Sequence, residues 1–220
     1  MAEGVTMGFY ENHVLPLIMD VALAGLKEDR QELIRQASGK VLEIGMGNGV
    51  NLPFYTSSAK QVVGLEPCEA VIAKARRKLR NWADNGMLQL GEKHYDLVVG
   101  GAEQLQFEDN SFDTIIASLV FCSISDSASA AKEAFRVLKP GGQLLFFEHV
   151  RSPDQRMCRI QNFANPFWKV FACGCCLNRD TATTFEEAGF EYRAITKFRN
   201  PRMSPPFAAW MIKGQASKPI

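Results

Sequence analysis

The chain has 220 residues, of which 46% are hydrophobic, enough for one large domain with a sizeable buried core. Its 25 Lys and Arg residues balance 24 Asp and Glu residues, a net charge of +1 that argues against a surface built to bind nucleic acid or anionic lipid. No window holds about 18 uninterrupted apolar residues, and no signal-peptide pattern is present, so we expect no membrane span. Six scattered cysteines in such a chain predict buried free thiols and a reducing, cytoplasmic location.

The first quarter of the chain predicts helices followed by a strand and a glycine-rich turn. Apolar residues from about Gly8 to Ala37 keep a mostly helical spacing that Pro16 and Gly25 interrupt, which indicates one broken or two short helices. The run from Val41 then reads as a buried strand that ends in three glycines one residue apart, Gly45, Gly47 and Gly49. Such a turn lets the backbone approach a ligand closely, although tight turns of this kind also occur without one.

A second strand ends in an acid at the spacing that nucleotide-binding units use. The run Gln61–Pro67 is apolar, and Glu66 follows Gly45 by 21 positions. In βαβ units an acid about 20 positions past the glycine turn hydrogen-bonds ribose hydroxyls, because both strand ends open on one crevice. The glycine pattern is Gly-x-Gly-x-Gly instead of the dinucleotide fingerprint Gly-x-Gly-x-x-Gly, so the match to NAD-type binding is imperfect.

The rest of the chain predicts further strands interleaved with helices, about seven strands in all. Pro53 suits the first turn of a helix, and a helix over Glu69 to about Ala83 has five bases on a solvated outer face. Asp126 can cap a helix from Ser127 to Leu138, and Lys139–Gly142 is typical of a turn. Strands are expected at Tyr95–Val99, Phe112 through Ile124, Gln143–Val150, Glu191–Thr196 and Phe207–Lys213, with a frayed tail after Gly214.

Five motifs in this order resemble the class I S-adenosylmethionine-dependent methyltransferases of methyltransferase type 11. They are Leu42–Gly49, Val63–Pro67, Gly101–Phe107, Phe112–Ser118 and Val137–Gln143, which together span about residues 40 to 150. The resemblance implies an α/β, Rossmann-like fold with a mostly parallel sheet and helices on both faces. It divides one domain, 1–220, into an N-terminal helical cap (1–38), a cofactor-binding core (39–150), and a substrate-side insertion with closing strands (151–220).

The same resemblance implies which residues bind S-adenosylmethionine, and S-adenosylhomocysteine after the reaction. Ala102 and Glu103 match the loop that contacts adenine, and Glu66 matches the ribose-binding acid, although Glu103 could be an ordinary loop acid. Glu43 and Asn51 are expected to support the methionine end of the cofactor. The full expected cofactor set is Glu43, Gly45, Gly47, Gly49, Asn51, Glu66, Pro67, Ala102, Glu103 and Ser118.

A substrate pocket is expected from aromatic residues and from the N-terminal helices. In the family, helices before the first strand often cover the cofactor, so Tyr10 and His13 are candidates to face the site, the alternative being helices that pack on the sheet edge. Phe121 and Trp168 are the other candidates, together with the aromatic segment 163–171. An aromatic, apolar pocket would suit a soft sulfur or a lipophilic substrate, and a packed core would show the same composition.

A narrower resemblance concerns the acceptor. Phe147–Val150, Asn165–Trp168, Arg179–Thr181 and Glu187–Phe190 are similar to the thiol S-methyltransferase branch called methyltransferase-like seven. Ser118–Phe121 lacks the Asx-Pro-Pro-Tyr of adenine and amide methyltransferases. We therefore expect a small-molecule methyltransferase that acts on a thiol. The alternatives are C- or N-methylation of a quinone precursor or lipid head group, or a non-catalytic S-adenosylmethionine-binding protein.

Two further features carry chemistry of their own. His149 stands at the carboxyl end of a strand, where it is a candidate proton acceptor or orienting group, or a histidine satisfied in the core. Cys173-x-Cys-Cys176 lacks the second Cys-x-x-Cys pair that structural zinc generally needs, so we predict no metal there and favour buried thiols or a pocket lining.

Overall fold

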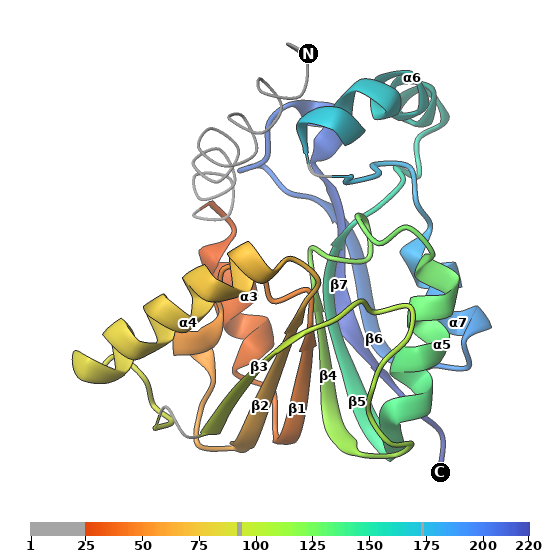
Figure 1. The fold of residues 1–220 in the computed structure, drawn as a ribbon. Helices are drawn as coiled ribbons and strands as arrows, with labels where there is room; N and C mark the ends of the chain where they lie inside the picture. Colours follow the sequence, from red (N-terminus) through yellow and green to blue (C-terminus); the bar gives the residue numbers. More distant parts are fainter. Residues whose placement is uncertain (1–24, 92–93, 173) are drawn as a thin grey trace, which may run out of the picture.

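The computed structural model describes residues 25–91, 94–172 and 174–220 (Figure 1). Its centre is a seven-stranded sheet with the strand order β3-β2-β1-β4-β5-β7-β6, in which β1 to β5 run parallel and β7 runs antiparallel to both β5 and β6. The predicted α/β fold with a mostly parallel sheet is confirmed. The strands are β1 (Gly39–Ile44), β2 (Ala59–Glu66), β3 (Tyr95–Val99), β4 (Phe112–Ser118), β5 (Leu138–His149), β6 (Glu191–Arg199) and β7 (Trp210–Ser217).

Helices cover both faces of the sheet and one of its ends. In Figure 1, α3 and α4 lie on one side of the sheet and α5 and α7 on the other, while α6 lies beyond the carboxyl ends of the parallel strands. The described helices are α3 (Lys27–Ile34), α4 (Glu69–Asp84), α5 (Ser127–Val137), α6 (Gln155–Phe171) and α7 (Thr181–Glu187), with 3-10 turns η2 (Leu52–Phe54) and η4 (Pro206–Ala208). No helix in the described ranges is long and apolar enough to cross a membrane.

Aspartates begin three of these helices. Asp126, Asp154 and Asp180 precede α5, α6 and α7, and each side chain accepts a hydrogen bond from the backbone N–H three residues later. A capping carboxylate satisfies one of the N–H groups that the first turn of a helix leaves without an intrahelical partner. Aspartate, whose side chain hydrogen-bonds the nearby backbone, therefore marks where these three helices start.

The core forms two apolar layers because successive strand residues point to opposite faces. On β4 and β5, Ile115 and Leu144 pack into the layer under α5 and α7, while Ile116 and Leu145 pack into the layer with α3 and α4. The central strands are therefore buried on both sides, which explains why their sequences are continuous apolar runs without alternation. The carboxyl ends of these strands are left as the open edge of the sheet.

The structure corrects several predicted strand boundaries. β4 ends at Ser118 instead of continuing to Ile124, because Leu119 takes a positive φ of 59° that a strand cannot continue. β5 begins at Leu138, so the expected turn at 139–142 lies within the strand. Pro53 does lie in the first turn of a helix, the short 3-10 helix Leu52–Phe54.

β7 spans Trp210–Ser217 instead of Phe207–Lys213. Its end is not frayed, because Ser217 pairs with both Gln143 and Glu191.

Candidate active site

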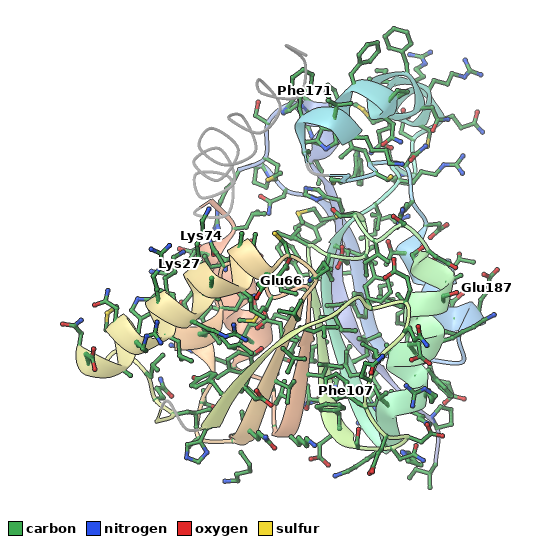
Figure 2. All side chains as sticks on the ribbon, viewed as in Figure 1. Lys27, Glu66, Lys74, Phe107, Phe171 and Glu187 are labelled. Atoms are coloured by element: carbon green, nitrogen blue, oxygen red, sulfur yellow. The ribbon has the colours of Figure 1, made fainter. Side chains whose placement is uncertain are left out.

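A cavity of about 410 Å³ opens at the carboxyl edge of the parallel strands. Its wall comes from the ends of β1 and β2, the loop after β3 and the turn after β4, which is the crevice where open α/β sheets bind ligands. Figure 2 shows Glu66 at this edge, at the end of β2. The lining residues are Ile44, Gly45, Leu65, Glu66, Pro67, Gly100, Gly101, Ala102, Glu103, Leu119, Val120, Ser123, Ile124 and Ser125.

The glycine turn after β1 forms one side of this cavity. Gly45, Gly47 and Gly49 have φ values of +63°, +58° and +78°, a region that side chains disfavour. A Cβ on Gly45 would collide with Val120, and one on Gly49 would lie 2.8 Å from Leu52. A Cβ on Gly47 would meet nothing within 4 Å. Gly45 and Gly49 therefore allow the protein to pack, whereas Gly47 leaves open space beside the cavity.

Glu66 connects the end of β2 to the glycine turn. Its Oε2 accepts a hydrogen bond from the Gly47 N–H at 3.2 Å, and its Oε1 accepts one from the Cys68 N–H at 3.1 Å. Burial raises the pKa of this carboxyl, and the two backbone hydrogen bonds oppose that rise. The carboxylate is thus fixed on the cavity wall, with acceptor capacity left for hydroxyl groups of a ligand.

Behind the glycine turn lies a buried polar network. Glu43 accepts hydrogen bonds from the Asn51 side chain at 2.6 Å and from the Tyr55 hydroxyl at 2.8 Å, and Arg30 donates to Asn51 Oδ1. Burial raises the pKa of Glu43 despite these partners. Neither Glu43 nor Asn51 lines the cavity. The structure places both where they support the turn, and a direct role at the methionine end of the cofactor stays a prediction.

The turn over residues 119–125 supplies the wall opposite Glu66, and sequence reasoning missed it. The carboxylate of Glu148 on β5 accepts hydrogen bonds from the N–H groups of Val120, Phe121 and Cys122 at 2.9, 3.0 and 3.2 Å. Glu148 is fully buried, and burial raises its pKa against these three bonds. The hydrogen bonds to Glu148 thereby hold the apolar segment after β4 in a turn, in which Val120 lines the cavity. An acid inside the apolar run of β5 was the available signal.

The remaining expected cofactor residues lie at or near the same cavity. Pro67, Ala102 and Glu103 line it, and Glu103 is exposed. Ser118 ends β4 directly before the lining residue Leu119, and its hydroxyl is buried without a hydrogen-bond partner. Ser118 itself does not line the cavity, and its role in holding the cofactor stays a prediction.

The expected substrate residues are not brought together. Phe121 is buried in the core, with its ring 4.8 Å from that of Phe185, because the turn after β4 directs it inward. Trp168 packs against Phe207 under α6, away from the cavity wall. Phe163 and Phe167 are 79% and 63% exposed on α6, and Figure 2 shows Phe171 on the same helix. The structure therefore does not place the segment 163–171 on the cavity wall. Tyr10 and His13 lie outside the described residues.

His149 lies at the carboxyl end of a strand, as the sequence predicts, and it is buried there. It does not line the cavity. Its Nδ1 is 3.9 Å from Cys175 Sγ, and its Nε2 is buried without a hydrogen-bond partner. A role as proton acceptor stays a prediction.

The residues at the cavity fit S-adenosylmethionine in their chemistry. Glu66 offers acceptors for ribose hydroxyls, Gly47 leaves room for close approach, and the unpartnered Ser118 hydroxyl lies beside an apolar wall. The sheet order with one antiparallel strand, together with this site, defines a class I S-adenosylmethionine-dependent methyltransferase.

Comparisons with known proteins agree with this class. A model of the methyltransferase domain matches residues 42–146. Human thiol S-methyltransferase TMT1B is 33% identical over 86% of this chain and 76% of its own length, and human thiol S-methyltransferase TMT1A is 30% identical over 74% and 66%. The N-methyltransferase NodS of Bradyrhizobium japonicum, crystallised with S-adenosylhomocysteine, shares the fold with a TM-score of 0.64 and 17% identity over 89% of this chain and 88% of its own.

The chain therefore belongs to the S-adenosylmethionine-dependent methyltransferase family that includes the thiol S-methyltransferases TMT1A and TMT1B.

Proposed function

We propose that this methyltransferase transfers a methyl group to the sulfur of a small thiol. The observation that carries the proposal is one continuous cavity that joins Glu66, the proposed ribose contact, to the turn at Val120 and Ser123. The cofactor and an acceptor would meet within this single space. The thiol as acceptor is supported by the likeness to TMT1B over most of the chain.

The chain's own residues would hold the cofactor from three sides. S-adenosylmethionine supplies a methyl group activated on a positively charged sulfur. Glu66 would accept hydrogen bonds from the ribose hydroxyls, and Ala102 and Glu103 would contact the adenine. Gly47 would leave space for the backbone to approach, with the Ser118 hydroxyl available to a polar ligand atom.

Methylation of a thiol at this cavity wall would need little acid–base catalysis. A free thiol has a pKa of about 8.5, so a few per cent is already thiolate near neutral pH. Leu119, Val120 and Ile124 give the acceptor end an apolar surface that would exclude water from a soft sulfur nucleophile. Placement of the nucleophile in line with the methyl group can then supply much of the catalysis.

The test is S-adenosylhomocysteine formation by the purified protein with a panel of acceptors. The panel holds hydrogen sulfide, alkyl thiols and aryl thiols, and, for the alternative substrates, a quinone precursor and phosphatidylethanolamine. We expect turnover with thiols alone, and Gly47→Arg should abolish it. Gly86→Arg is a matched control, because Gly86 also has a positive φ of 65° and open space around it but lies at the end of α4. Turnover with the quinone precursor or lipid and none with thiols would overturn the proposal.

We further propose that the protein works in a reducing compartment, as expected for the cytoplasm. Cys68, Cys122, Cys158, Cys175 and Cys176 are all free, and four of them are buried. Buried free thiols persist where the surroundings keep cysteine reduced.

A further inference from the structure

A buried cluster of two cysteines and a histidine lies beside the cavity. Cys122 comes from the turn after β4, His149 from the end of β5, and Cys175 from the loop after α6. One potential ligand atom from each residue lies within 4.8 Å of the other two, and all three residues are buried. The fold therefore gathers three metal-binding side chains from positions far apart in the sequence, which motif spacing could not reveal.

The imidazole of His149 has unused bonding capacity. The residue is only 8% exposed, its Nε2 has no hydrogen-bond partner, and its Nδ1 faces Cys175 Sγ at the long distance of 3.9 Å. The nitrogen that faces the cluster is Nδ1, and its separation from Cys175 Sγ is longer than a good hydrogen bond. A cation within the cluster would therefore bind the imidazole through Nδ1.

The spacing of the cluster suits a tetrahedral cation. Zinc bonds of about 2.3 Å to sulfur and about 2.0 Å to nitrogen place tetrahedral ligand atoms about 3.5 to 3.8 Å apart. The Cys175–His149 separation of 3.9 Å is close to that edge, and the other separations, up to 4.8 Å, exceed it by at most about 1 Å. Thiolate and imidazole ligands favour Zn²⁺ over Mg²⁺ or Ca²⁺.

We propose that Cys122, His149 and Cys175 form a zinc site with one open coordination position. Three protein ligands are typical of zinc sites that exchange a fourth ligand, whereas structural sites have four. Cys176 is not part of the set, because its thiol donates to the Gly174 carbonyl at 3.5 Å. The proposal assigns His149 to metal binding instead of proton transfer.

The open position would serve the acceptor thiol, a step that rests on the proposed function. Ser123 follows Cys122 directly and lines the cavity, and its Oγ is 3.6 Å from Cys122 Sγ. A thiol that reached the cation from this side would bind through sulfur as the thiolate, and the S–H proton would pass to solvent. The zinc would thus hold the acceptor in its nucleophilic form at the cavity wall.

The first experiment measures metal binding without any cofactor. The full chain, purified with a phosphine reductant, is stripped with a chelator, and Zn²⁺ or Co²⁺ is added back. We expect one zinc per chain and, with Co²⁺, the intense sulfur-to-cobalt absorption and visible bands of a tetrahedral site. Cys122→Ser and Cys175→Ser should weaken zinc binding by more than the roughly 10–100-fold that loss of an outer-shell partner costs. Cys176 is a buried cysteine in the same loop as Cys175, and the control variant Cys176→Ser should bind zinc as tightly as the wild type does.

Thermal unfolding and S-adenosylhomocysteine binding show whether each variant remains folded. Wild-type protein that binds no Zn²⁺ and gives no sulfur-to-cobalt band overturns the site, whatever the variants do. Unchanged zinc affinity in folded Cys122→Ser and Cys175→Ser overturns the ligand assignment.

The second experiment adds an alkyl thiol to the Co²⁺ protein. A shift in the cobalt spectrum that the matching alcohol does not cause is the expected result, and its absence overturns the open position. Failure of this inference is distinct from failure of the proposed function. Equal thiol methylation by metal-free and zinc-loaded protein would refute only the role of zinc in holding the acceptor, whereas zinc binding without methylation of any thiol would refute only the proposed acceptor.

Discussion

Gly47 offers the sharpest test of the cofactor site, because its replacement separates backbone strain from lost binding. Gly47 and Gly86 have nearly the same φ, +58° and +65°, and a Cβ on either would meet nothing within 4 Å. Alanine at each position should therefore cost only the left-handed backbone strain, about 1 kcal/mol of the free energy of unfolding. In a chain of this size that corresponds to about 2–4 °C in Tm for both variants.

Only Gly47→Ala places its methyl group where the cofactor is expected to approach. An extra methyl group in a close-packed contact costs about 1–3 kcal/mol, which corresponds to roughly 5- to 150-fold weaker S-adenosylmethionine binding. Titration calorimetry gives the dissociation constants, and thermal unfolding with and without cofactor gives an independent check, because bound ligand raises Tm. Equal cofactor affinity in the two variants would refute the placement of the cofactor beside Gly47.

Three further predictions follow from burial and hydrogen bonding. Because burial raises the pKa of Glu66 and ribose hydroxyls need its ionised form, S-adenosylmethionine affinity should fall as pH falls through that raised pKa. Glu66→Gln should bind S-adenosylmethionine more weakly, and its affinity should not depend on pH in this way. A pH profile of binding that runs parallel to that of the wild type would contradict the ribose-binding role of Glu66. Glu43→Ala leaves two buried donors, the Asn51 amide and the Tyr55 hydroxyl, without an acceptor. It should lower the free energy of unfolding in urea titrations by about 2–5 kcal/mol, and a loss below about 1 kcal/mol would contradict the network. Phe121→Ala should lower the free energy of unfolding by about 3–5 kcal/mol, and the exposed control Phe163→Ala should lower it by less than about 0.5 kcal/mol. Similar losses in the two variants would show that Phe121 does not belong to the core.

The sheet and the cofactor side of the site could be predicted because their signals are local. A strand buried on both faces has a continuous apolar sequence, as β1 does. A turn that requires positive φ usually has glycine there, as at Gly45 and Gly47. Glu66 was found for the same reason, since its distance along the chain from the glycine turn is set by one βαβ unit. Each signal depends on residues that are neighbours in sequence.

The acceptor side depends on contacts between distant segments, and there the sequence is less informative. Aromatic composition suggested that 163–171 lines a pocket, but α6 turns Phe163 and Phe167 toward solvent, and composition does not report which side of a helix packs. The cluster of Cys122, His149 and Cys175 was missed for a related reason. Its members come from the ends of two strands and a loop, so spacing rules designed for local metal motifs had nothing to detect.

Glu148 shows how one long-range contact shapes both halves of the site. Its carboxylate accepts hydrogen bonds from the backbone of Val120, which lines the cavity, and from the backbone of Cys122, which is one of the proposed zinc ligands. Leu119 enters the left-handed region so that the following N–H groups converge on this acid, and the chain leaves the sheet although its sequence favours a strand. The next residue on β5 is His149, so the same two positions fix the turn and supply a ligand. One buried carboxylate therefore holds in place the backbone of both halves of the site.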